Sequence, residues 1–145
     1  MKNDIILKKM TSLEHCIDRL EKKRPEKWEL FLEDYDLQDI ISVNLERAVQ
    51  LTVDIGLQTL LELNIQPPES MGEVFSLLSR EKIISEELSE HLKSAVGFRN
   101  IAVHEYEDID WKIVQSILVH NLADFRHFMK SIFEFEDIDH RSCEP

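Results

Sequence analysis

The chain has 145 residues and a formal net charge of −12, with 43% of its residues hydrophobic and 32% charged. This length suits one helical domain over residues 1–145, and the composition excludes an intrinsically disordered chain. The negative charge opposes broad, non-specific binding of nucleic acids, so no binding to DNA is expected. No apolar run approaches the roughly 20 residues of a membrane span, which predicts a cytoplasmic protein without membrane association.

The first predicted helix covers residues 3–24. Its apolar residues recur at alternating steps of four and three, which is typical of one face of an amphipathic helix. These residues are Ile6, Met10, Leu13, Ile17 and Leu20. Asn3 or Asp4 can cap this helix, and Pro25 ends it because proline disfavours helical geometry at the residue before it. Pro25 can itself open a short second helix that carries Trp28 and Phe31.

The longest predicted helix runs from Leu37 to about Leu63, with Asp36 as its cap. It carries two apolar stripes rather than one. The first stripe is Leu37, Ile41, Leu45, Ala48, Thr52, Ile55 and Thr59, and the second is Val49, Val53, Leu57 and Leu60. A helix that is apolar on more than one side is central to its bundle or borders a second chain.

Local signals also mark the helices of the second half. Ser70 and Glu73 form a capping box for a short helix, and Ser85 caps the helix that leads into residues 99–106. A turn at residues 107–110 precedes the last helix, whose apolar stripe is Val114, Leu118, Leu122, Phe125, Met129 and Ile132. After Phe135 the chain is polar, and residues 136–145 are expected to form a frayed tail.

The sequence therefore predicts an all-α, up-and-down bundle of four long helices with one or two short extra helices. Only three glycines and four prolines are present, which is too few for an all-β fold with many turns.

Four polar residues interrupt the apolar end of the helix that begins after Ser85: Arg99, Asn100, His104 and Tyr106. Each residue of a regular helix turns by about 100°, so Asn100 and His104 can touch and Arg99 and Tyr106 share a face. Arg99 and His104 are splayed by roughly 140° on the same arithmetic. Their side chains meet only if the helix ends within the motif or if a second chain supplies another copy.

A second copy suits metal-independent cleavage of RNA. That reaction needs a base for the 2′-OH proton, an acid for the leaving 5′ oxygen and a cation for the phosphate. A two-fold dimer places two histidines and two arginines in one cleft, and the arginine fork matches phosphate oxygens. His120 and His127 share a face of the last helix but lack a further ligand at suitable spacing, so no metal is expected.

Residues Arg99-Asn100-x-x-x-His104-x-Tyr106 match the R-x4-6-H pattern of HEPN domains in its R-N-x3-H-x-Y form. The preceding residues Val96-Gly97-Phe98 and the helical residues 39–47 resemble the HepT branch of these domains. The order and spacing of the elements are similar over about residues 3–135. The chain is thus identified, by resemblance, as a HepT-like HEPN protein.

The resemblance implies a homodimeric helical bundle that is the RNase toxin of a type VII-like toxin–antitoxin pair. It implies that Arg99 and His104 form the RNase site, with Asn100 as the supporting polar residue. Tyr106 is then the hydroxyl to which the partner antitoxin, an MNT-type minimal nucleotidyltransferase, transfers AMP. No cofactor is implied. Because acidic residues crowd the motif at Glu105, Glu107 and Asp108, RNA is expected to bind only a narrow site at the dimer cleft.

Two other interpretations remain open. The chain can be a non-catalytic helical module that binds a nucleotidyltransferase and presents Tyr106 to it. Alternatively, the four polar residues of the motif can form a hydrogen-bond network that fixes the register of the bundle and has no chemical role. Substitution of His104 separates these interpretations, because only a nuclease loses RNA cleavage while it keeps its fold.

Overall fold

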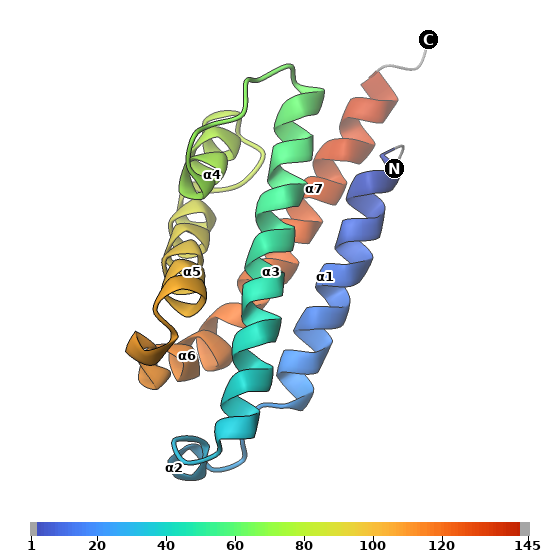
Figure 1. Cartoon of the computed structure of the whole chain (residues 1–145). Helices are drawn as coiled ribbons and strands as arrows, with labels where there is room; N and C mark the ends of the chain where they lie inside the picture. The colour runs from blue at the N-terminus through green and yellow to red at the C-terminus, as the bar shows by residue number, and fades with distance from the viewer. Residues whose placement is uncertain (1–2, 143–145) are drawn as a thin grey trace.

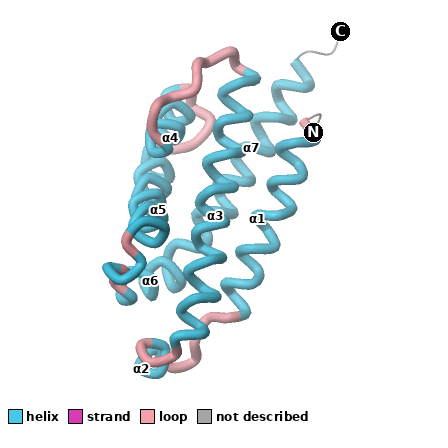
Figure 2. Tube along the Cα trace, viewed as in Figure 1, coloured by secondary structure: helices cyan, strands magenta, loops and turns pink. Residues whose placement is uncertain are grey.

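The computed structural model describes the backbone of residues 3–142 and the side chains of residues 3–137. Four long helices dominate this part of the chain, and no strand occurs in it (Figure 2). They are α1 (Asp4–Lys22), α3 (Tyr35–Glu62), α5 (Glu86–His104) and α7 (Leu122–Ser142). Shorter elements connect them: α2 (Trp28–Phe31), α4 (Met71–Arg80), the 3-10 helix η1 (Tyr106–Asp108), α6 (Trp111–Ser116) and the π-helix η2 (Ile117–Asn121). The predicted all-α, four-helix bundle is confirmed.

Helix α3 is the centre of the bundle. It packs against α1, α2, α4, α5 and α7, and α1 and α7 cover the side opposite α4 and α5 (Figure 1). Both predicted stripes of α3 contribute buried residues, including Ile41, Ile55, Val49 and Leu60. Of the two alternatives for a helix that is apolar on several sides, the central position is therefore the one observed.

Side-chain caps begin most helices where the sequence predicted them, with α2 and α3 as exceptions. Helix α2 begins at Trp28 and not at Pro25, and it has no side-chain cap. The Asn3 oxygen accepts from the backbone N–H of Ile6, and Ser70 and Ser85 accept from residues three positions later. Asp36 was the predicted cap of α3, but the cap is Asp34, whose carboxylate accepts from the N–H of Leu37 at 3.0 Å. The helix begins two residues earlier than expected. Asp36 lies in its first turn, where its negative charge interacts favourably with the helix dipole.

The last predicted helix is divided by the π-helix η2. Its buried residues Val114, Leu118 and Leu122 follow one another at steps of four, with no step of three between them. Val114 lies in α6, Leu118 in η2 and Leu122 in α7, so the π-helix falls within the buried stripe of the last predicted helix. Helix α7 does not end near Phe135 but continues to Ser142, so the polar segment from residue 136 begins within the helix. Residues 143–145 lie outside the described residues.

No helix within residues 3–142 is both long enough and apolar enough to cross a membrane.

The N-terminal end of α3 lies at the same end of the bundle as η1 and α6, which follow α5 (Figure 1). This end of the bundle carries the motif residues.

Candidate active site

Arg99 lies near the end of α5 with a guanidinium that is only partly satisfied. Its Nη1 donates to the Oδ1 of Asn100 at 3.4 Å, and its buried Nε has no hydrogen-bond partner among the described residues. None of the ion pairs within the described side chains includes Arg99. Leaving a buried donor unpaired is unfavourable. A guanidinium without an acidic partner can bind an oxyanion through its planar fork.

His104 is the last residue of α5, and its side chain is exposed. The backbone N–H of Glu105 bonds to the Ile101 carbonyl at 2.7 Å, so the helix is regular up to this residue. Arg99 and His104 therefore remain roughly 140° apart around one helix. Among the described residues, no hydrogen bond or ion pair joins the side chains of Arg99 and His104 within one copy of the chain.

Tyr106 lies outside α5, at the start of η1. The expected shared helical face of Arg99 and Tyr106 is therefore wrong, because α5 ends at His104. The hydroxyl of Tyr106 donates a hydrogen bond to the Oδ1 of Asp39 on α3. The Tyr106 residue as a whole is 41% exposed.

The surroundings of Tyr106 keep its phenol protonated. Partial burial, the hydrogen bond with Asp39, and the negative charges of Asp39 and Glu46 together raise the pKa of Tyr106 to about 12. The acidic residues that act on the phenol thus come from α3. Sequence reasoning drew attention to the neighbouring Glu105, Glu107 and Asp108 and missed Asp39. No spacing pattern links Asp39 with Tyr106, because 67 residues separate them.

A series of aromatic rings holds the phenol ring in place. Trp111 at the start of α6 contacts Tyr106 edge to face, with ring centroids 6.0 Å apart. The buried Phe31 of α2 contacts Trp111 at 5.7 Å, and Trp28 contacts Phe31 at 5.6 Å. Edge-to-face pairs at these distances are favourable. The short helix α2 therefore supports the position of Tyr106, a role that the sequence alone did not indicate.

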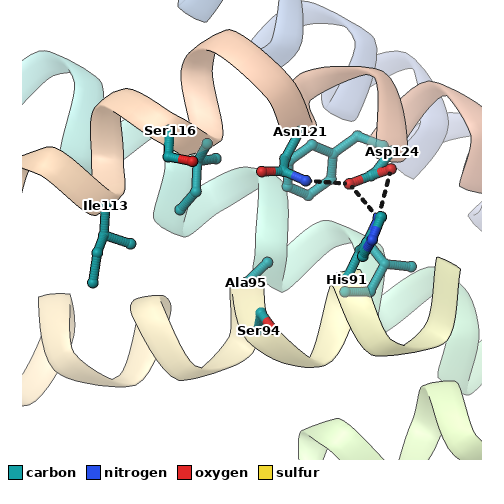
Figure 3. Close-up of a pocket in the computed structure, with 10 residues that line it drawn as sticks. His91, Ser94, Ala95, Ile113, Ser116, Asn121 and Asp124 are labelled. Atoms are coloured by element: carbon teal, nitrogen blue, oxygen red, sulfur yellow. Dashed lines mark hydrogen bonds and ion pairs between the residues drawn. The ribbon is translucent and has the colours of Figure 1, made fainter. Parts of the chain in front are cut away.

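A separate cavity of about 260 Å³ lies between α5 and the segment formed by α6, η2 and α7 (Figure 3). His91 and Asp124 point toward each other across it, with 3.2 Å between His91 Nδ1 and Asp124 Oδ2. Asn121 donates to the same carboxylate at 2.9 Å. No group of three His, Cys, Asp or Glu residues placed to hold a metal ion occurs among the described residues.

Comparison with known proteins identifies the family. The model of the family described as "Ribonuclease HepT-like" matches residues 13–132. An mRNA nuclease HepT of Shewanella oneidensis is 35% identical over 130 residues, which cover 90% of this chain and 97% of that protein. A tRNA nuclease HepT of Aphanizomenon flos-aquae is 28% identical over 106 residues, covering 73% of this chain and 72% of that protein.

A solved structure extends this similarity to three dimensions. The tri-AMPylated HEPN toxin of Shewanella oneidensis, in complex with an MNT antitoxin, superposes with a TM-score of 0.86. The two chains are 34% identical, and the superposition covers 91% of this chain and 98% of that one. The resemblance based on Arg99, Asn100, His104 and Tyr106 is confirmed at the level of sequence family and of fold. The chain belongs to the HepT-like ribonuclease family.

Proposed function

We propose that this protein is the toxin of a type VII-like toxin–antitoxin pair and cleaves RNA as a metal-independent endoribonuclease in the cytoplasm. The active unit is a homodimer whose cleft combines Arg99 and His104 of both copies, with Asn100 in support. The incompletely satisfied guanidinium of Arg99, on the same motif as the exposed His104, is the observation that carries the proposal. The names of the nuclease relatives support the same reaction.

In the proposed reaction, one His104 takes the proton of the ribose 2′-OH, and the oxygen attacks the adjacent phosphorus. The His104 of the second copy donates a proton to the leaving 5′ oxygen. Arg99 binds the phosphate oxygens through its planar fork and stabilises the charge that develops on them. Asn100 accepts from Arg99 and restricts the position of its guanidinium.

AMP transfer to Tyr106 by an MNT-type nucleotidyltransferase is the proposed means of silencing. The similar Shewanella toxin is tri-AMPylated and in complex with an MNT antitoxin, and Tyr106 here is a partly exposed tyrosine. Each added AMP introduces a phosphodiester with one negative charge. That charge competes with RNA phosphate for Arg99 and repels the incoming RNA backbone.

The test is cleavage of RNA by the purified protein and by its Arg99→Ala and His104→Ala variants. Loss of a general acid and base lowers the rate by about 10²-fold to 10⁴-fold, and we expect His104→Ala to fall in this range. Arg99→Ala is expected to lose at least about 10²-fold, as when one charge-stabilising donor is removed. Growth after induction of each variant provides the matching measurement in cells.

Arg80→Ala and His120→Ala are suitable controls because both residues are exposed and lie outside the motif. They are expected to cleave RNA and to inhibit growth as the unchanged protein does. If His104→Ala and Arg99→Ala also retain full cleavage, the alternative of a non-catalytic module that binds a nucleotidyltransferase replaces the nuclease. A drop in melting temperature as the main effect of either variant indicates a network that only fixes register.

A further inference from the structure

We propose that Asp39 is a catalytic residue in the modification of Tyr106, in which its carboxylate takes the phenolic proton as the hydroxyl attacks a nucleoside triphosphate. The toxin then supplies the base for its own inactivation. This inference rests on the proposed AMP transfer to Tyr106 and adds a residue on α3 that the R-x4-H motif does not contain.

The hydroxyl and the ring of Tyr106 are both held by neighbouring side chains. The Tyr106 hydroxyl has one proton, and the hydrogen bond directs that proton to the Oδ1 of Asp39. The lone pairs of the phenolic oxygen therefore point away from Asp39 and are free to approach phosphorus. The edge contact with Trp111 fixes the ring, so both ends of the tyrosine side chain are oriented before a partner binds.

The Tyr106 phenol is protonated at neutral pH. The pKa of Tyr106 is about 12, which is about five units above neutral pH. Only on the order of one phenol in 10⁵ is therefore ionised at pH 7. Attack through pre-formed phenolate would therefore be rare. A base in contact with the hydroxyl removes the proton during the attack, and Asp39 is the group in that position.

A bond forms between the Tyr106 oxygen and the α-phosphorus, the bond from that phosphorus to the bridging oxygen breaks, and pyrophosphate leaves. The phenolic proton moves to Asp39, which is exposed and returns it to water. Carboxylates that receive the proton of an acceptor hydroxyl are established in phosphoryl transfer, as in the catalytic loop of protein kinases.

Other charged groups near the phenol do not share this position. Glu46, also on α3, raises the pKa of Tyr106 through its charge alone, and no hydrogen bond to the phenol is observed for it within the described residues. Glu105 and Glu107 flank Tyr106 in the chain, and Asp108 follows in η1. The element packed on the other side contributes Trp111, which does not titrate. Glu46 is thus the matched control for loss of a nearby negative charge.

The experiment follows AMP transfer to the Asp39→Asn variant, with ATP and the partner nucleotidyltransferase, by intact-protein mass spectrometry over time. All chains carry His104→Ala so that they can be produced without cleaving RNA. Asparagine keeps the size and an oxygen acceptor but cannot take a proton. We expect the first AMP to be added about 10²-fold to 10⁴-fold more slowly to Asp39→Asn. Glu46→Gln should react within a few-fold of the reference.

Two further measurements separate catalysis from positioning. Asp39→Glu restores a carboxylate, and we expect AMP transfer to this variant to be at least tenfold faster than to Asp39→Asn. The ratio of the Asp39→Asn rate to the reference rate should rise about tenfold per pH unit from pH 7 to 9, because only phenolate reacts without the base. A misplaced tyrosine would lower the rate by the same factor at every pH.

Equal rates for Asp39→Asn and the reference would overturn the role of Asp39 and leave the proposed modification intact. A pH-independent ratio, or no recovery in Asp39→Glu, would likewise overturn it, with circular dichroism confirming that each variant is folded. If the reference chain gains no AMP, or gains it in a Tyr106→Phe variant as well, the proposed function itself fails and the inference fails with it.

Discussion

Arg99 and Tyr106, which are seven residues apart, are held in opposite ways. The Arg99 guanidinium has one long hydrogen bond to its neighbour and a buried Nε without a partner among the described residues. The Tyr106 hydroxyl is fixed by Asp39, and its ring is fixed by Trp111. A group that is to bind phosphate must remain open, whereas a group that is to be modified once must be presented in a defined orientation.

At the residue scale, the first prediction concerns the ionisation of Tyr106. The chain has two tyrosines, so a Tyr35→Phe variant reports Tyr106 alone by its phenolate absorbance. We expect a midpoint near pH 12, because burial, Asp39 and Glu46 oppose ionisation. Adding Asp39→Asn removes a negative charge in contact with the phenol, so the midpoint should move toward the ordinary value of 10.0. An unchanged midpoint would contradict the contact with Asp39.

The same pKa has a consequence for stability. Since the folded-state pKa lies above the ordinary value, the protonated phenol stabilises the native state, and this contribution is complete below about pH 10. It is lost as the pH rises from about 10 to about 12. We expect the urea midpoint of unfolding to fall more between pH 9 and 11.5 in the unchanged protein than in Tyr106→Phe. A parallel decline in both would show that Tyr106 makes no such contribution.

Sequence reasoning identified the proposed site residues that are close together along the chain, and it did not connect Tyr106 with Asp39, which folding brings near. Arg99, Asn100 and His104 fall within six residues, so one short pattern contains them. Asp39 is 67 residues from Tyr106, and no periodicity connects them. The end of α5 at His104 was also not fixed in advance, because neither Gly nor Pro follows it to mark a helix end.

At the scale of elements, the helices were predictable because their signals are local. Caps at Ser70 and Ser85 act on residues three positions later, and apolar spacing along α1 is regular. The π-helix η2 was not predicted, although the buried residues Val114, Leu118 and Leu122 follow one another at steps of four across it. A step of four also occurs in ordinary helices, so this pattern alone does not specify a π-turn.

Helix α3 passes close to α4 at Gly56, which provides a second prediction. A Cβ atom at this position would lie 2.6 Å from Val74 Cγ1 and 3.2 Å from Leu78 Cδ1. Alanine gains about 0.5–1 kcal/mol in helix propensity, but overpacking against a stiff valine costs about 1–3 kcal/mol. We therefore expect Gly56→Ala to lower the free energy of unfolding by about 1 kcal/mol, measured by urea denaturation at fixed protein concentration.

Gly97→Ala is the matched control within α5. Apart from its chain neighbours and the nearby backbone of α5, no atom of the described residues lies within 4 Å of a Cβ built at Gly97, so alanine should stabilise the helix by about 0.5–1 kcal/mol. The two substitutions are thus expected to change the free energy of unfolding in opposite directions. Gly56→Ala as stable as the unchanged protein would contradict the close packing of α3 and α4. If Gly97→Ala is destabilising and dissociates the dimer, a second copy packs against this position.

On the scale of the whole molecule, the charge distribution favours a small RNA site. The net charge is −12, and several cations are already paired within the described part of the chain. Arg126 of α7 bonds to three carboxylates of α1, those of Glu14, Asp18 and Glu21, while Lys9 pairs with Asp54 at 3.5 Å. Such pairs neutralise positive charge that could otherwise bind phosphate. Arg99 has no acidic partner among the described residues, so its positive charge is not neutralised by an ion pair.

This contrast leads to a prediction about salt. For single-stranded nucleic acid, the slope of log K against log salt concentration is about −0.7 per neutralised phosphate. Two Arg99 side chains in one dimer cleft contact two phosphates, so we expect a slope of about −1.4 for RNA binding by His104→Ala. Fluorescence anisotropy of a labelled RNA oligonucleotide, measured at several salt concentrations, provides the value. A protein with a broad basic surface would give a much steeper dependence.

The Arg99→Ala, His104→Ala double variant tests whether the slope comes from the proposed cleft. Without the two guanidinium groups, binding should weaken and the slope should approach zero, because the remaining surface repels phosphate. Lys130→Ala serves as the control, since Lys130 is an exposed cation of α7 outside the motif. A slope steeper than about −3, or one unaffected by Arg99→Ala, would mean that other lysines and arginines bind the RNA. In that case RNA would contact the protein over a surface wider than the cleft.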